Sequence, residues 1–403
     1  MPEAAPPGLP AYVTSYTLTS ALGAGNDATL DALRAHRGGL RSCGLRGGGT
    51  TWLGLVDGLE GEAAAITGPL QAFDCRANRL LRLALAQDGF MREVARARDR
   101  YGPHRVGCFI GTIGSGLQDL EQRYQRYAPG GGDLGPAVRL DCTTHLYSAP
   151  DYCRRLLGLT GPAATISTAC SSSAKVFCSA HRSLAAGLCD AAIVGGIDCA
   201  NETFVYGFRA LGLLSGAPCR PWDRKRDGLS VGEAAGFALL EREPLADGAI
   251  ALLGFGESAD AYHITAPHPE GNGAEAAMRS ALRHAGLLPD DIDYINLHGS
   301  GTPANDASED QAVHRLFGDG IPCSGTKGWT GHTQGAAGIA EAVLSLLSIK
   351  HGFIPATLNT AEPDPDLKAR IVLRNTARAV KRVLSNSFGF GGSNCALVFG
   401  AGR

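Results

Sequence analysis

Short apolar runs alternate with helical patterns along most of this chain, and glycine-rich turns separate them. The apolar runs predict strands at residues 105–110, 163–166, 191–197, 292–297, 321–324, 383–387 and 395–399. The helical patterns predict helices at residues 117–127, 174–188, 307–317 and 336–349. Strands that alternate with helices in this way are typical of α/β proteins with buried sheets. The predicted fold class is therefore α/β.

The second half of the chain repeats the order of strands, turns and helices found in the first half. No close repeat is visible at single residues, but a recurring pattern of elements indicates an internal duplication. We therefore expect two units, residues 1–250 and 251–403. The segment 204–243 is rich in glycine, arginine and tryptophan, and we expect it to carry surface and interface loops.

Length and charge narrow the range of partners. The chain has 403 residues, of which 44% are hydrophobic, which is enough for two domains or one large duplicated core. Its formal net charge of -2 gives no general attraction to nucleic acid or to an acidic membrane surface. No basic cluster with interleaved aromatic residues is present. We therefore expect neither a nucleic-acid partner nor a membrane partner.

The twelve cysteines are scattered and include no Cys-x-x-Cys pair, so a disulfide framework or a zinc site is not expected. The proline-rich start of the chain lacks the basic and apolar regions of an export signal. No apolar run is long enough to span a bilayer. These features predict a protein of the reducing cytoplasm.

Cys170 lies where the apolar stretch 163–166 gives way to the helical pattern of 174–188. A thiol at the start of a helix is close to unpaired backbone N–H groups and to the positive end of the helix dipole. Both favour negative charge, and they are the conditions that lower a cysteine pKa and activate a thiolate. Free cysteines are also commonly buried and inert, and the local sequence leaves both interpretations open.

Two histidines lie in glycine-rich turns downstream. His298 ends the predicted strand 292–297, at the edge of the sheet where ligands bind in α/β folds. His332 begins a helix of small residues that allow close packing. Either one alone is better explained as a helix cap or a buried structural residue. Together with Cys170 they favour a site for nucleophilic catalysis. The same three residues could ligate zinc, but no fourth ligand occurs at a usual spacing, so no metal site is expected.

Several longer motifs occur in order along nearly the whole chain. They are Thr-Ala-Cys-Ser-Ser at 168–172, Arg-Pro-Trp-Asp at 220–223, Gly-Glu-Ala-Ala-Gly at 232–236, His-Gly-Ser-Gly-Thr-Pro at 298–303, Lys-Gly-Trp-Thr-Gly-His-Thr-Gln-Gly-Ala-Ala-Gly at 327–338 and Asn-Ser-Phe-Gly-Phe-Gly-Gly-Ser-Asn at 386–394. This set resembles the elongating β-ketoacyl-ACP synthases. The resemblance implies a thiolase fold, which is a duplicated, five-layered α-β-α-β-α core, and normally a dimer.

The resemblance also implies a reaction. Cys170 would carry the acyl group as a thioester, and a carbanion formed by decarboxylation of malonyl-ACP would attack it. His298 and His332 would donate hydrogen bonds to the malonyl thioester oxygen, where negative charge builds up. The backbone N–H groups of Cys170 and Phe390 would form a second oxyanion hole, and Phe390 would also gate the acyl pocket.

Further residues have supporting roles by the same resemblance. Ser300 and Thr302 would bind the phosphopantetheine arm of the substrate. Lys327 would pair with Glu309 and help to fix the histidine loop, while the alternative for Glu309 and Asp306 is an exposed helix start. No cofactor of the enzyme itself is implied. The expected partners are acyl carrier protein and either a second copy of the chain or a chain-length-factor-like subunit.

Some positions depart from the usual family pattern. Gly301 follows Ser300 where many relatives have His-Gly-Thr-x-Thr, and the serine hydroxyl preserves the hydrogen bond. The serines at 171–173, Trp329 and the segment 267–271 are similar to synthases of aryl polyene and related pigment clusters. This similarity predicts a rigid, conjugated, aryl-primed acyl chain.

Three other members of the superfamily remain as alternatives. A thiolase, which is a non-elongating acyltransferase, would need a second catalytic cysteine, and Cys395 is the only candidate near the C-terminus. An initiating synthase would have asparagine in place of His332. A structural partner subunit would have lost Cys170 or a histidine. The residues present favour the elongating enzyme.

Overall fold

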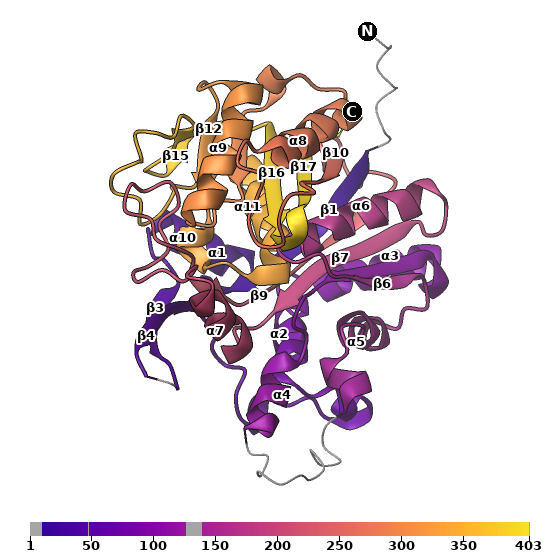
Figure 1. Ribbon diagram of the computed structural model, residues 1–403. Helices are drawn as coiled ribbons and strands as arrows, with labels where there is room; N and C mark the ends of the chain where they lie inside the picture. Colours follow the sequence, from indigo (N-terminus) through magenta and orange to yellow (C-terminus); the bar gives the residue numbers. More distant parts are fainter. Residues whose placement is uncertain (1–9, 47, 126–138, 403) are drawn as a thin grey trace.

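A computed structural model describes residues 10–46, 48–125 and 139–402 of the chain. Among these residues the main feature is a twelve-stranded sheet, in which one half of the chain supplies each side (Figure 1). The strands of the first half are β1 (Ala11–Ser20), β5 (Val106–Gly111), β6 (Ala163–Ile166), β7 (Ala191–Asp198) and β9 (Ala234–Glu241). Those of the second half are β10 (Ile250–Ala259), β11 (Tyr294–Leu297), β12 (Pro322–Gly325), β16 (Arg382–Gly389) and β17 (Ser393–Ala401).

The two halves have the same topology. The first half has the order β1-β9-β7-β5-β6, and the second has the order β10-β17-β16-β11-β12. In both halves the first three strands of this order are antiparallel and the remaining pairs are parallel. β1 pairs with β10 and so joins the halves. The repeat expected from the sequence is therefore present in the topology. Residue 250 is the first residue of β10, and its use as a domain boundary stays a prediction.

Two helices lie between the halves. α6 (Ser172–Ala185) packs against β5 and β7 of the first half and against β17 of the second. α11 (Ala337–His351) packs against β16 and also against β9. Each follows the third strand of its own half in chain order, so the two helices are topological equivalents.

Outer helices cover the far sides of both halves. On the first half these are α2 (Arg76–Leu85), α3 (Phe90–Tyr101) and α5 (Ser148–Leu157), and on the second they are α8 (Asn272–Ala285) and α9 (Pro303–Phe317). Together with the two halves of the sheet and the middle helices they make five layers, in the order α-β-α-β-α (Figure 1).

The middle layer depends on small side chains. A Cβ on Gly338 of α11 would lie 2.4 Å from the backbone N of Ala174 in α6, so only glycine allows this approach. The Ser173 hydroxyl of α6 accepts a hydrogen bond from the Ile339 N–H of α11, at 2.9 Å. The N-terminal ends of the two helices are therefore held together directly.

The remaining strands and α-helices are all shorter than ten residues, and some of them, such as the helix Lys327–Thr330, are fully buried. They are β2 (Gly23–Ala24), α1 (Asn26–Arg34), β3 (Leu40–Gly44), β4 (Thr50–Gly54), α4 (Leu117–Tyr124), α7 (Glu202–Ala210), β8 (Val231–Gly232), α10 (Lys327–Thr330), β13 (Phe353–Ile354), β14 (Arg370–Ile371) and β15 (Thr376–Ala377). None of the helices in the described part of the chain is long and apolar enough to cross a membrane.

The prediction for 204–243 is wrong in one part. The segment does contain loops, but it ends in β9, which is fully buried between β1 and β7. Its residues are apolar on both faces, because the outer helices cover one side and α11 covers the other.

Candidate active site

Cys170 lies in the sharp turn that joins β6 to α6, directly before the N-cap residue Ser171. The preceding residue, Ala169, has φ of 53°, in the left-handed region that non-glycine residues rarely adopt. The Ser172 hydroxyl holds this turn by donating to the Ala169 carbonyl oxygen at 2.6 Å. The predicted position of the thiol at a helix start is confirmed.

The thiol itself is not a low-pKa cysteine. Its residue is 7% exposed, and burial raises the pKa of the Cys170 thiol to about 11. The positive charge of Lys327 and the backbone N–H groups of Phe390 and Cys170 act in the opposite direction, but desolvation outweighs them. The expectation of a lowered pKa is therefore wrong. The two N–H groups interact with the sulfur, and their role as a second oxyanion hole stays a prediction.

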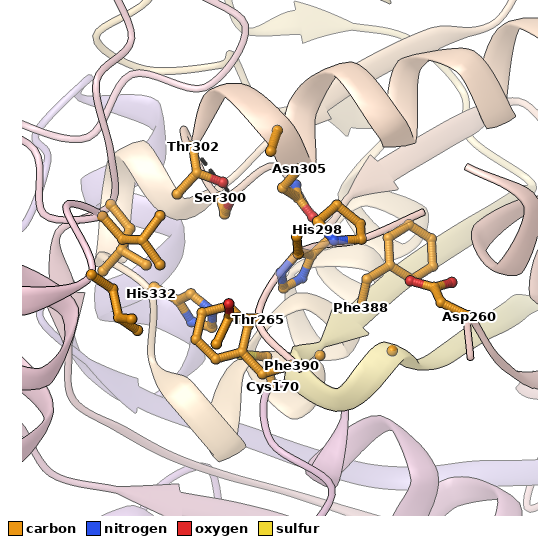
Figure 2. A pocket seen from close by; sticks show the side chains of 18 of the residues that line it. Cys170, Asp260, Thr265, His298, Ser300, Thr302, Asn305, His332, Phe388 and Phe390 are labelled. Atoms are coloured by element: carbon orange, nitrogen blue, oxygen red, sulfur yellow. Dashed lines mark hydrogen bonds between the residues drawn. The ribbon is translucent and has the colours of Figure 1, made fainter. Parts of the chain in front are cut away.

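His298 and His332 meet beside this thiol (Figure 2). His298 directly follows β11, and His332 lies in the turn between α10 and α11. Their ring centroids are 5.4 Å apart, with the ring planes at 81°. Burial lowers the pKa of both imidazoles well below 6.5, and the nearby Lys327 charge lowers them further. Both rings are therefore neutral at pH 7.

Hydrogen bonds fix which ring nitrogen carries the proton. Lys327 Nζ lies 3.2 Å from His298 Nδ1, and an ammonium group can only donate. The backbone N–H of Gln334 donates to His332 Nδ1 at 3.1 Å. Since both Nδ1 atoms accept, both Nε2 atoms carry the proton. The site therefore holds two neutral N–H donors.

The ion-pair partner of Lys327 differs from the predicted one. Lys327 pairs with Glu341 of α11, not with Glu309, and it also donates to the His298 carbonyl oxygen. Glu341 is 3% exposed, and burial raises the pKa of its carboxyl to about 7 against the effect of Lys327. The pairing with Glu309 fails because that side chain accepts hydrogen bonds from backbone N–H groups on the other side of the His298 loop.

The two predicted carboxylates still support this loop. Glu309 accepts from the N–H groups of His298 at 2.8 Å and Gly299 at 2.9 Å. Asp306 accepts from the Gly301 N–H at 3.2 Å, and it is fully buried. The alternative of an exposed helix start is therefore excluded for both residues.

The hydroxyls of Ser300 and Thr302 lie on the same side of the hollow (Figure 2). They are 2.8 Å apart and form a hydrogen bond with each other. Both side chains line the pocket that contains Cys170 and the two histidines. The structure thus brings together all the residues predicted to contact substrate.

The pocket has a volume of about 200 Å³ and a mostly apolar lining. Phe390 lies across it, and its ring is 6.0 Å from that of Phe208 in α7 (Figure 2). A Cβ on the preceding Gly389 would lie 3.1 Å from the Cys170 backbone N. A side chain at this position would crowd the N–H of Cys170.

The described residues contain no group of three or more His, Cys, Asp or Glu side chains placed to hold a metal ion. The sequence did not reveal Glu341, which pairs with Lys327, nor other residues that line the pocket, such as Asp260 and Asn305. The sequence signal for Glu341 was its position as the single carboxylate in residues 337–348, which are otherwise apolar or small. All twelve of these residues are buried.

The chain is similar to known proteins over most of its length. Residues 70–246 match the family model of the beta-ketoacyl synthase N-terminal domain, and residues 250–361 match that of the C-terminal domain. The 3-oxoacyl-[acyl-carrier-protein] synthase 2 of Coxiella burnetii is 38% identical over 312 residues, which are 73% of this chain and 75% of that protein. Nodulation protein E of Rhizobium sp. (strain N33) is 34% identical over 366 residues, or 85% and 89% of the two chains.

Two solved structures support the same assignment. The ketosynthase ApeO of Xenorhabdus doucetiae, in complex with its chain length factor ApeC, has a TM-score of 0.90 and 40% identity over 98% of both chains. The ishigamide ketosynthase/chain length factor has a TM-score of 0.87 and 29% identity over 98% of this chain and 99% of that one. The chain therefore belongs to the β-ketoacyl synthase family and has the thiolase fold of that family.

Proposed function

We propose that this protein catalyses the decarboxylative condensation of malonyl-ACP with an acyl group held on Cys170. The observation that carries the proposal is the meeting of one thiol with two neutral imidazoles, both of which carry the proton on Nε2. A decarboxylation that produces an enolate needs this arrangement, because two N–H donors stabilise the developing oxyanion without giving up a proton.

The first half-reaction transfers the acyl group. The Cys170 sulfur attacks the carbonyl carbon of acyl-ACP, and the N–H groups of Cys170 and Phe390 stabilise the oxyanion that forms. The bond to the pantetheine sulfur then breaks, and that sulfur leaves as a thiol with the proton lost by Cys170. An acyl-enzyme thioester remains.

The second half-reaction forms the carbon–carbon bond. The thioester oxygen of malonyl-ACP accepts hydrogen bonds from Nε2–H of His298 and His332. The bond to the carboxylate breaks, CO₂ leaves, and its electron pair forms the enolate. The enolate carbon attacks the carbonyl carbon of the thioester on Cys170, and the bond to that sulfur breaks. The sulfur takes up a proton from water, which restores the thiol, and the β-ketoacyl-ACP product is released.

Supporting roles follow from the lining of the pocket. Ser300 and Thr302 bind the amide groups of the phosphopantetheine arm, since their paired hydroxyls are polar groups in a mostly apolar lining. Phe390 separates the pocket from the acyl chain, and the glycines after it, with φ of 78° and 73°, let it move. The group carried by the substrate supplies all the thioester chemistry, and no further cofactor is proposed.

A thiolase is less well supported. Cys395, the only candidate for its second cysteine, is fully buried in β17, and its sulfur lies 3.6 Å from that of Cys178. It does not line the pocket that contains Cys170. A non-catalytic partner subunit is also disfavoured, because Cys170, His298 and His332 are all in place.

We also propose the partners and the setting. Acyl carrier protein delivers both substrates, and a second ketosynthase-like subunit pairs with this one, as in the two similar complexes with chain length factors. The acyl chain is of the rigid, conjugated, aryl-primed kind. This part of the proposal rests on the similarity of the segment 267–271 to aryl polyene synthases, and Pro267 of that segment lines the pocket. The proposed location is the cytoplasm.

Mass spectrometry tests the proposal directly. Incubation with an acyl-ACP should add one acyl group to Cys170, and a Cys395→Ser variant should give the same adduct. A Cys170→Gln variant should not condense but should still release CO₂ from malonyl-ACP, since both histidines remain. Full condensation by an enzyme whose Cys170 stays unmodified would refute the mechanism.

A further inference from the structure

A second buried carboxylate lies behind His332. Asp198 ends β7 and is completely buried. It accepts hydrogen bonds from the Thr112 hydroxyl and the Gly114 N–H, both at 2.8 Å, and from the Ile113 N–H at 3.1 Å. It also accepts from the N–H of Gly335, again at 2.8 Å. One side chain thus joins the loop after β5 to the segment that follows His332.

Every partner of Asp198 is a donor. Three are backbone N–H groups, and the Thr112 hydroxyl already accepts from the Ser115 N–H at 3.0 Å, so its own proton is directed to Asp198. Only an ionised carboxylate can accept from all four groups at once. Burial raises the pKa of the Asp198 carboxyl to about 6, and the donors oppose that rise, so the group is ionised at pH 7.

The connection to His332 passes through Gln334. Its N–H sets the proton position on the imidazole by donating to Nδ1. To do so Gln334 has φ of 58°, a left-handed conformation that non-glycine residues adopt only where neighbouring contacts hold them. One such contact is the next peptide N–H, of Gly335, which is bound to Asp198. Another is the Gln334 amide, which donates to the Cys199 carbonyl oxygen at 3.4 Å.

The contact between these segments is tight. A Cβ on Gly335 would lie 2.5 Å from Asp198 Oδ2 and 3.0 Å from the Ile113 N. The carboxylate binds the Gly335 N–H directly, at 2.8 Å. A shorter or uncharged group at position 198 would therefore release the peptide after Gln334.

We propose that Asp198 is a positioning residue for the decarboxylation half-reaction: it holds Gln334 in the conformation that orients His332. This inference rests on the proposed function, because it assigns to His332 the role of an oxyanion donor. Asp198 does not contact substrate, and its effect on the reaction passes through the His332 ring.

The test separates the two half-reactions. In a Cys170→Gln background, adding Asp198→Asn should lower kcat for CO₂ release from malonyl-ACP at least tenfold. In an enzyme with Cys170 intact, Asp198→Asn should change the rate of acylation by acyl-ACP less than threefold. Asp310→Asn is the matched control, since Asp310 is equally buried and accepts from the Lys368 and Ala369 N–H groups. Asp310→Asn should leave the rates of CO₂ release and of acylation within twofold of those of the corresponding enzymes without this substitution.

Two results would overturn the inference. One is an unchanged rate of decarboxylation, and the other is an equal loss in both half-reactions, which indicates general misfolding. If Asp198→Asn does not fold, Thr112→Val provides the test, because it removes only one of the four donors to Asp198, together with the acceptor of the Ser115 N–H. It should lower decarboxylation two- to fivefold, and Thr112→Ser should restore it. A parent Cys170→Gln enzyme that releases no CO₂ would instead reject the proposed function.

Discussion

At the scale of single residues, the surroundings of the nucleophilic Cys170 hold it in position but leave its thiol protonated in the resting enzyme. Burial keeps the Cys170 thiol protonated, with a pKa of about 11. The backbone N–H groups directed at its sulfur act on the charge that develops during attack. A neutral resting thiol is also less open to oxidation than a thiolate. The reactivity of Cys170 therefore depends on the bound substrate, on which the charge develops during attack.

This leads to a prediction for the pH dependence of alkylation. Because the pKa is raised, the thiolate fraction is small at pH 7 and grows about tenfold for each pH unit until the pH approaches the pKa. The rate of Cys170 carboxamidomethylation by iodoacetamide should therefore rise without a plateau from pH 7 to pH 9. Subtracting the rate of a Cys170→Ala variant removes the contribution of Cys43 and Cys142, which are both partly exposed. A plateau below pH 8 would contradict the buried, neutral thiol.

Lys327 and Glu341 form a buried pair whose members depend on each other. Lys327→Met leaves the Glu341 carboxyl buried without its cation, and breaking such a pair costs about 3–5 kcal/mol in the free energy of unfolding. Adding Glu341→Gln should recover part of this loss, because the remaining group is then neutral. Urea unfolding of the two single variants and the double variant measures the coupling. If the loss in free energy of unfolding of the double variant equals the sum of the losses of the two single variants, the pair is not coupled.

The sequence predicted some of these residues much better than others. His298 and His332 lie in glycine-rich turns, and Cys170 lies where an apolar run gives way to a helical pattern. Each of these positions is marked by a local pattern within one segment. Glu341 and Asp198 act through partners from distant segments. Nothing in the local sequence shows which backbone N–H groups a buried carboxylate will meet. The Lys327–Glu309 pairing failed for this reason.

At the scale of elements, the strands beside the site were easier to predict than those that join the halves. β6 begins and ends at the predicted residues, since it is a short apolar run between turns. β1 was missed because it mixes threonine and serine with apolar residues, although it is mostly buried in the middle of the sheet. β9 was predicted to belong to a loop segment, because the residues before it in 204–243 are rich in glycine, arginine and tryptophan. Pairing with adjacent strands, which local sequence does not reveal, stabilises both.

The close contact of α6 and α11 gives a prediction at this scale. Gly338→Ala places a Cβ 2.4 Å from the Ala174 backbone N, so the two helices must separate. We expect a loss of about 1–3 kcal/mol in the free energy of unfolding, typical of overpacking, and slower condensation. Gly207→Ala in α7 is the control, because a Cβ there meets nothing within 4 Å. It should stabilise the protein by up to about 1 kcal/mol, as alanine does in helices. Guanidinium unfolding measures both changes, and equal effects would contradict the packing explanation.

At the scale of the whole molecule, duplication explains where the site lies. Cys170 and His332 precede equivalent helices, α6 and α11, and both helices start at the surface where the two halves meet. His298 follows the second strand of its half. The sequence predicted the repeat from the order of elements, but the shared middle layer required the three-dimensional structure. The thiol comes from one half and the oxyanion donors from the other.

Among the residues that the structure describes, the sheet ends in an open edge that lies close to the nucleophile. β6 is the last strand of the first half, and the turn that holds Cys170 follows it directly. Its partner β5 donates to the carbonyl oxygens of Pro162 and Ile166. Since alternate residues of a strand face the same neighbour, the backbone groups of Ala163 and Thr165 face away from β5. An unpaired edge of this kind favours pairing with a second subunit.

We therefore expect subunit association to depend on the backbone of β6. Thr165→Pro removes an outward N–H and adds a ring at the open edge, while the pairing with β5 through Ala164 and Ile166 stays in place. Association with a second copy, or with a co-expressed chain-length-factor-like subunit, should weaken at least tenfold by analytical ultracentrifugation. Thr165→Val is the matched control, because it loses the hydroxyl bond to the Leu146 carbonyl oxygen but keeps the backbone N–H. It should associate like the parent protein. If Thr165→Pro folds and associates normally, the partner binds elsewhere, and the site near Cys170 is complete within one chain.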